Sequence, residues 1–262
     1  MVKTKKITVI KLNTKKRTIK KRTIKKRTIK KRTIKNKSKS CNIYTKPKNF
    51  IFGYGSLINS YSRKYTGKGF IGNGIPVVLS KKTGYNRVWT CKKSNYGNYS
   101  FLGLIKDKKN ALDINGIIMP VYKCIKNFDK REKGYKRIKI RYNPKIKNAF
   151  TALSWQKMPN YPCNIYIYTI TDRLYNKPNK KCPISQNYLD TVLSGCLEYG
   201  NDFAIDFLKN TSNWCDKAGK MYCKNDRNKN KRCWIKNNNK KNKVKIDRLL
   251  KKVMPIIIKE RY

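Results

Sequence analysis

Hydrophobic positions in the middle of the chain predict strands first and helices afterwards. Short apolar or alternating runs predict strands at 49–52, 114–121, 135–142 and 163–169. Apolar residues then recur at helical spacing over 184–198, where Pro183 suits a first turn and Gly200 a stop. A shorter helix follows, with Asn201 or Asp202 as its cap. This order of elements indicates an α+β fold.

Both ends of the chain lack such a pattern. Residues 1–48 contain 21 Lys and Arg and no acid, and Lys-Arg-Thr-Ile-Lys occurs four times between Lys16 and Lys35. A period of five gathers the isoleucines on no single face of a helix or a strand, so we expect this segment to be disordered. It is a candidate for nuclear localisation or for non-specific binding of nucleic acid or another polyanion. The alternative is a solvated arm without a specific partner.

The chain becomes rich in Lys and Asn again after about residue 215. We therefore expect a domain at 49–215 and a basic C-terminal extension at 216–262. An amphipathic stretch at 246–254, which ends at Pro255, predicts a short helix in that extension. Such a helix could pack on the domain or bind a partner.

The amino-acid composition favours some classes of partner and excludes some kinds of catalytic and metal site. The formal charge is +53, from 66 Lys and Arg against 13 acids, which favours polyanionic partners, although A/T-rich codon usage would also enrich Lys and Asn. There is no histidine, which excludes histidine bases, triads and metal ligands. The nine cysteines form no CxxC pair and predict no metal site. Most are expected to be reduced thiols, with Cys124, Cys163 and Cys196 in the core. Without a visible signal peptide or membrane span, we expect an intracellular protein, cytoplasmic or nuclear.

Two segments are candidates for chemistry. In Phe52-Gly-Tyr-Gly-Ser-Leu57 a strand runs into two glycines, and such a turn can aim backbone N–H groups at a carboxylate or phosphate. An isolated Gly-x-Gly is more often a tight turn. The second segment, 128–135, places Glu132 just before Gly134 and a strand. Its carboxylate could face a cavity, or it could belong to a solvated run of charges.

Taken together, these segments carry a resemblance. Tyr54-Gly-Ser-Leu57 followed by Arg131-Glu-Lys-Gly-Tyr135 resembles the γ-glutamylcyclotransferase family. Residues 59–63 and 84–89 are similar to further segments of the family, and 183–198 and 203–214 to the C-terminal helices of one of its branches. The resemblance includes neither end of the chain.

The resemblance implies a small mixed β-barrel with flanking helices. It also implies release of 5-oxoproline from a γ-glutamyl peptide or amine, without a metal or other cofactor, when the substrate's α-amine attacks its own γ-carbonyl. Glu132 would be the general base. The substrate-binding residues would be Gly53, Tyr54, Gly55, Ser56, Leu57 and Tyr135, with Arg87 either pairing with a substrate carboxylate or supporting a strand.

Two matters stay open at this stage. Lys130, Arg131 and Lys133 would lower the pKa of Glu132 if they face it, whereas burial would raise that pKa if they point outward. A second hypothesis keeps the fold without the chemistry and assigns the basic ends to nucleic-acid binding.

Overall fold

The computed structural model describes residues 46–68, 71–92, 98–123, 125–146, 149–153, 156–170, 176–228 and 240–262. The chain divides into a segment Met1–Tyr44 and a unit Thr45–Tyr262, and every described residue belongs to the second. The expected disorder of 1–48 therefore lies outside the described residues, apart from 46–48. No described helix is long and apolar enough to cross a membrane.

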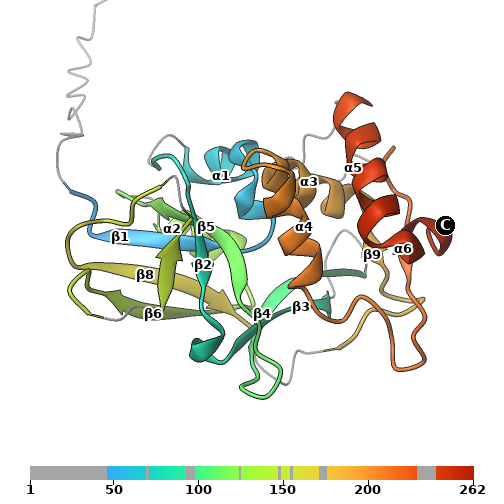
Figure 1. Cartoon of the computed structure of the whole chain (residues 1–262), viewed down its shortest axis with the longest axis horizontal. Helices are drawn as coiled ribbons and strands as arrows, with labels where there is room; N and C mark the ends of the chain where they lie inside the picture. Colours follow the sequence, from blue (N-terminus) through green and yellow to red (C-terminus); the bar gives the residue numbers. More distant parts are fainter. Residues whose placement is uncertain are drawn as a thin grey trace, which may run out of the picture. The chain divides into compact units, whose positions relative to one another are not determined.

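Within the described residues, the strands form a six-stranded and a four-stranded sheet. Figure 1 shows how the larger sheet curls beside the helices. The larger sheet has the order β6-β8-β1-β5-β2-β7, in which β1 runs parallel to β8 and the other neighbours are antiparallel. Its strands are β1 (Asn49–Gly53), β2 (Ile75–Leu79), β5 (Ile114–Pro120), β6 (Lys136–Tyr142), β7 (Phe150–Ala152) and β8 (Cys163–Thr169). The smaller sheet has the order β10-β9-β4-β3, formed by β3 (Tyr85–Lys92), β4 (Tyr99–Lys106), β9 (Ile184–Ser185) and β10 (Cys223–Lys224).

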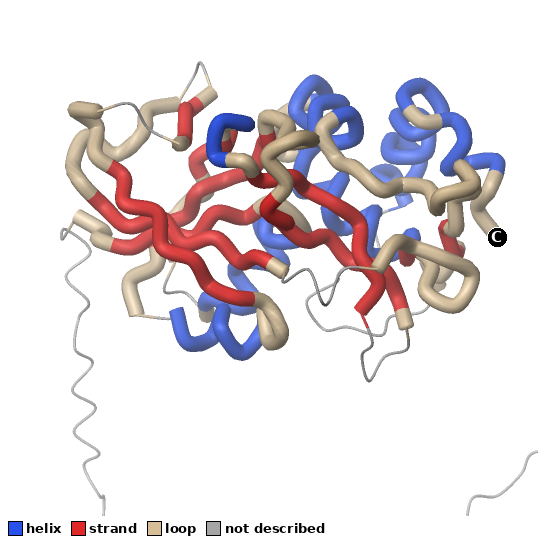
Figure 2. Tube along the Cα trace, turned by 90° about the horizontal axis from the view of Figure 1, so that it is seen from below, coloured by secondary structure: helices blue, strands red, loops and turns tan. Residues whose placement is uncertain are grey.

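The described helices are α1 (Ser60–Gly67), α2 (Ile125–Arg131), α3 (Gln186–Leu197), α4 (Asn201–Lys209), α5 (Lys240–Val253) and α6 (Pro255–Lys259), with 3-10 turns η1 (Ser56–Ile58) and η2 (Lys81–Thr83). The longest of them, α3 and α5, lie in the second half of the unit. Figure 2 shows most of the blue helical segments toward one end of the red strands. Helix α4 packs on β5, and α5 packs on α3 and α4.

The core explains why the central strands read as apolar in sequence. Every residue of β5 is buried, and β1 is buried on both faces after Asn49. Because successive side chains alternate, Phe50 and Phe52 lie on one face of β1 and Ile51 on the other. Apolar contacts on both faces fix the register of the strand that leads into the candidate substrate loop.

The predicted α+β class is confirmed, with a curled mixed sheet and flanking helices. The four strands predicted from periodicity correspond to β1, β5, β6 and β8. The helix predicted at 184–198 begins at Gln186, because Ile184 and Ser185 pair with β10 and the Ser185 side chain caps the helix. Pro183 is therefore not in its first turn. The cap of α4 is Gly200, whose φ of 111° favours glycine.

The C-terminal residues are part of the folded unit. Strand β10 pairs with β9, and Ile246, Leu250 and Ile257 are fully buried. Helix α5 begins at Lys240, earlier than the helix predicted at 246–254. The boundary expected at 215 therefore matches no break in the structure, and the amphipathic helix packs on its own domain.

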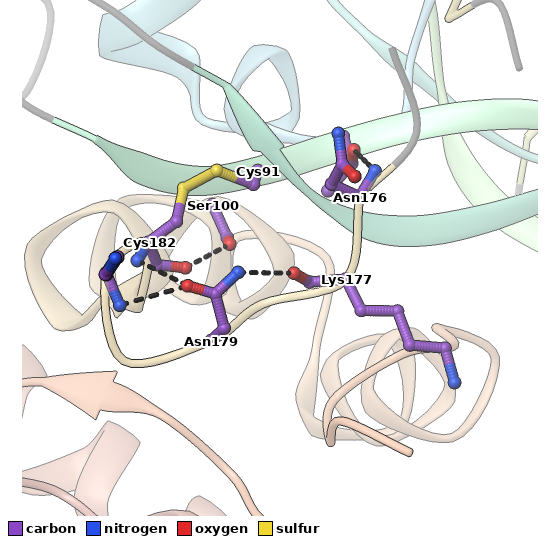
Figure 3. The surroundings of a disulfide bond; sticks show 8 residues. Cys91, Ser100, Asn176, Lys177, Asn179 and Cys182 are labelled. Atoms are coloured by element: carbon purple, nitrogen blue, oxygen red, sulfur yellow. Dashed lines mark hydrogen bonds between the residues drawn. A yellow bond between two sulfur atoms is a disulfide. The ribbon is translucent and has the colours of Figure 1, made fainter. Parts of the chain in front are cut away.

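A second correction concerns cysteine. Cys91 and Cys182 form a disulfide that joins β3 to the segment before β9 (Figure 3). Backbone hydrogen bonds support it: the N–H of Cys91 donates to Asn176 O (2.7 Å), and the Ser100 hydroxyl donates to Cys182 O (2.8 Å). These two cysteines are exceptions to the expectation that most of the cysteines are reduced thiols. Cys163 and Cys196 are free and buried, as predicted, whereas Cys124 lies outside the described residues.

Candidate active site

The loop between β1 and α1 is tightly packed from both sides. A Cβ added to Gly53 would lie 2.8 Å from Leu57 Cβ, and one added to Gly55 would lie 3.1 Å from the Tyr188 hydroxyl. Gly53 therefore has no room for a side chain, whereas a side chain at Gly55 would require the Tyr188 hydroxyl to move by a few tenths of an ångström. The N–H of Ile58 donates to Gly55 O (2.9 Å) and closes the 3-10 turn. No described residue accepts from the N–H of Ser56 or Leu57, as is usual in the first turn of a helix.

Glu132 stands at the turn between α2 and β6. Its N–H donates to Phe128 O (2.8 Å), and its carbonyl accepts from the N–H of Tyr135 (2.9 Å). Gly134, with φ of 91°, lets the chain reverse into β6. The Glu132 side chain is 19% exposed. The turn thus holds the carboxylate partly buried, between a helix end and a strand start.

Arg131 connects this turn to the loop. One terminal nitrogen donates to Ser56 Oγ and Ser62 Oγ, both at 2.9 Å. The other donates to Ser62 O (2.9 Å) and Thr66 Oγ1 (2.5 Å). Arg131 Nε lies 3.3 Å from Glu132 Oε1. A single guanidinium, only 10% exposed, therefore contacts the glycine loop, α1 and Glu132.

Of the three cations that flank Glu132 in sequence, Arg131 is the one that turns inward. The residues Lys130 and Lys133 are exposed. The two candidate segments, 75 residues apart between Ser56 and Arg131, are therefore brought together by a residue inside the second motif.

Three tyrosines surround the carboxylate: Tyr54, Tyr135 and Tyr188. Burial raises the pKa of each phenol, and the negative charge of Glu132 raises all three further. The Tyr54 hydroxyl donates to Tyr168 O (2.7 Å), and the Tyr135 hydroxyl donates to Leu102 O (3.0 Å). We call these three side chains the site phenols. They stay neutral through the physiological pH range.

Arg87 lies beneath the loop with no exposed surface. Its guanidinium donates to Asn115 O (2.7 Å), Thr211 Oγ1 (2.8 Å) and Phe207 O (3.1 Å), and it reaches Tyr54 O at 3.4 Å. Burial lowers the pKa of Arg87 to about 9. Arg87 ties β5 and α4 to the carbonyl of Tyr54, which is the structural role that the sequence left open.

Tyr188 is the site residue that sequence reasoning missed. It lies on α3, where its helical spacing marked it only as a core residue, and a hydrogen bond with Ser56 partly opposes the rise in its pKa. Trp89 and Phe101 meet its ring edge to face at 5.8 and 5.1 Å. Only the fold brings this phenol next to a loop more than 130 residues earlier in the chain.

Among the described residues, no group of three or more Cys, Asp or Glu is arranged to hold a metal ion. Nine chains of solved structures are similar to this one, and three serve as examples. An uncharacterized protein from Homo sapiens is 13% identical, with a TM-score of 0.44 over 64% of this chain and 91% of that chain. A γ-glutamyl cyclotransferase is 14% identical, with a TM-score of 0.45 over 66% and 92%. A solution structure from Arabidopsis thaliana is 12% identical, with a TM-score of 0.32 over 50% and 76%. No family model matches the chain, and no curated protein does.

Proposed function

We propose that the chain is a γ-glutamylcyclotransferase-like enzyme that releases 5-oxoproline from a γ-glutamyl peptide or amine. The observation that carries the proposal is the guanidinium of Arg131, which contacts both Ser56 in the glycine loop and the carboxylate of Glu132. Each segment alone has an ordinary structural interpretation. Their contact supports a common site in which a carboxylate stands beside a loop suited to holding an anion.

The proposed reaction begins with the α-ammonium group of the substrate, which must lose a proton before it can attack. Glu132 takes that proton, and the free amine attacks the γ-carbonyl carbon of the same molecule. The tetrahedral intermediate collapses with cleavage of the bond between the γ-carbon and the leaving nitrogen. Glu132 returns its proton to that nitrogen and then takes the excess proton that the ring nitrogen carries after the attack. The products are 5-oxoproline and a free amine, and the second proton is released with them. No water is consumed.

Positioning accounts for much of the expected rate, because nucleophile and electrophile belong to one molecule. The backbone of Gly53, Gly55 and Leu57, with Tyr54 and Ser56, would hold the α-carboxylate and orient the amine. Arg131 would keep this loop and Glu132 at a fixed separation. The neutral hydroxyls of Tyr135 and Tyr188 would border the reacting carbonyl without adding charge.

The test is an assay of 5-oxoproline release from glutathione, other γ-glutamyl peptides and γ-glutamylamines. We expect at least one class to react and Glu132→Gln to lower kcat by about 10²-fold or more. Glu260→Gln is the matched control, because it makes the same change at the far C-terminal end of the unit and should keep the parent rate. Absence of 5-oxoproline from every substrate, or a fully active Glu132→Gln variant, would overturn the proposal.

A further inference from the structure

The exposed edge of the larger sheet carries a row of cations. Among the described strands, β6 pairs with β8 alone and forms an edge of the sheet. Its residues Arg137, Lys139 and Arg141 are exposed and alternate along the strand, so they share one face. Alternate residues of a strand stand about 6.6–6.8 Å apart. We call these three residues the basic edge.

The charge of this row is largely uncompensated. Arg137 pairs with Asp129 at 2.6 Å, on the exposed surface. Among the ion pairs of the described residues, none includes Lys139 or Arg141. The basic edge therefore offers at least two cations to a ligand.

An aromatic ring lies within the row. Tyr166 stands opposite Lys139 in the register of β6 and β8, on the same face, and is partly exposed. The guanidinium of Arg137 lies over its ring, 5.1 Å from the centroid. Proteins that bind single-stranded nucleic acid combine cations, which contact the phosphates, with aromatic rings, on which the bases stack.

Two lysines that precede β1, Lys46 and Lys48, are held against the same part of the sheet. Asn164, opposite Arg141 in the sheet, donates its N–H to Lys48 O (2.9 Å) and its amide to Asn49 Oδ1 (3.2 Å). Lys46 Nζ lies 5.4 Å from the ring centroid of Tyr161. The backbone of Lys48 therefore lies beside the end of the basic edge.

We propose that the basic edge binds the phosphate backbone of single-stranded nucleic acid and that Tyr166 offers a stacking surface for a base. Charged edge strands also prevent sheets from pairing edge to edge, but that purpose does not require an aromatic ring beside the cations. The inference does not depend on Glu132 or on cyclotransferase activity.

The first experiment measures binding of the full chain to a fluorescein-labelled 20-nucleotide single strand and to a duplex of equal length, by anisotropy between 50 and 300 mM NaCl. Lys139→Gln/Arg141→Gln should reduce the slope of log K against log salt by about 1.4 for the single strand, since each phosphate contact contributes about 0.7. Lys251→Gln/Lys252→Gln removes the same charge from exposed positions of α5 and should leave the slope unchanged. Equal effects of the two pairs would mean unspecific attraction, and tighter duplex binding would refute the single-strand assignment.

A second measurement reports on single residues. Acetylation of lysines by an amine-reactive ester, read by mass spectrometry, should slow at Lys139 when the single strand is added and stay constant at Lys251. Vesicles of anionic phosphatidylserine replace the nucleic acid in a parallel arm. Protection of Lys139 by the vesicles but not by the single strand would assign the surface to membranes and overturn the proposal, as would no protection by either.

Discussion

Replacement of Arg131 by lysine keeps the positive charge but removes the planar guanidinium with its two terminal nitrogens. Arg131 makes four hydrogen bonds through two terminal nitrogens that point in different directions. A lysine has a single nitrogen with three protons. From any one position that nitrogen cannot donate to both Ser56 and Thr66, as the two nitrogens of the guanidinium do. We therefore expect Arg131→Lys to separate the effect of geometry from the effect of charge.

The size of the effect follows from burial. The side chain is 10% exposed, so little water can replace a lost partner. A hydrogen bond from a charged donor contributes about 1.5–3 kcal/mol. Loss of one of the four predicts a decrease of about 1.5–3 kcal/mol in the free energy of unfolding, or a Tm lower by roughly 3–12 °C. If the loop then shifts by about 1 Å against Glu132, kcat should fall by roughly 10²-fold.

Urea unfolding, followed by tryptophan fluorescence, and the 5-oxoproline assay would be run on the same preparations. Arg137→Lys is the matched control, because its ion pair with Asp129 is about one-third exposed on both sides and should cost less than about 1 kcal/mol. The reasoning is refuted if Arg131→Lys costs no more stability than Arg137→Lys and also keeps the parent kcat.

Three further predictions concern the rest of the unit. The free energy of unfolding should fall as the pH rises above 10, by up to about 1.4 kcal/mol per pH unit for each of the three site phenols. The reason is that the folded state keeps protons that the unfolded chain releases. A flat profile from pH 9.5 to 11 in urea titrations would contradict this. Arg227→Met should cost about 3–5 kcal/mol at pH 8, because it leaves the buried Asp190 without its cation. That loss should shrink at pH 5, since burial raises the pKa of Asp190, and equal losses at both pH values would exclude the explanation. Cys91→Ser/Cys182→Ser should cost about 2–4 kcal/mol, because the disulfide closes a loop across 91 residues; dithiothreitol should reproduce the loss in the parent and leave the variant unaffected.

Periodicity predicted the elements that bury an apolar face. Strands β1, β5 and β8 were visible because their buried positions are mostly apolar. Helix α3 was visible because its apolar residues recur at helical spacing, although polar residues such as Gln186 and Asp190 are buried beside them. Helix α1 was not, since its buried residues are Ser62, Arg63, Thr66 and Gly67. A helix whose inner face is polar shows no 3.6-residue hydrophobic pattern.

Ion pairs between residues far apart in the chain also could not be predicted from the sequence. The apolar face of α5 could be read from the sequence, but its attachment depends on Arg227, which bridges Asp190 on α3 and Asp247 on α5 at 2.6 and 2.7 Å. Neither carboxylate is a helical neighbour of that arginine. The spacing of residues in the sequence therefore could not predict whether α5 packs on its own domain, and the structure shows that it does.

The polar inner face of α1 and the position of Glu132 belong to one arrangement. Ser62 and Thr66 present oxygen atoms toward Arg131 because that guanidinium occupies the place where an apolar residue would otherwise pack. Hydroxyl and carbonyl oxygens satisfy its protons but do not neutralise its charge, and the carboxylate that Arg131 contacts is Glu132.

Glu132 should therefore stabilise the fold as well as act in the proposed reaction. We expect Glu132→Gln to lower the free energy of unfolding by about 1–3 kcal/mol, because an amide leaves a buried guanidinium without a counter-charge. Glu260→Gln should have little effect, and the double variant Arg131→Met/Glu132→Gln should cost less than the sum of its single changes. Additive losses in urea unfolding would show that the two side chains act independently, and Arg131 would then not be the link between the glycine loop and the candidate base.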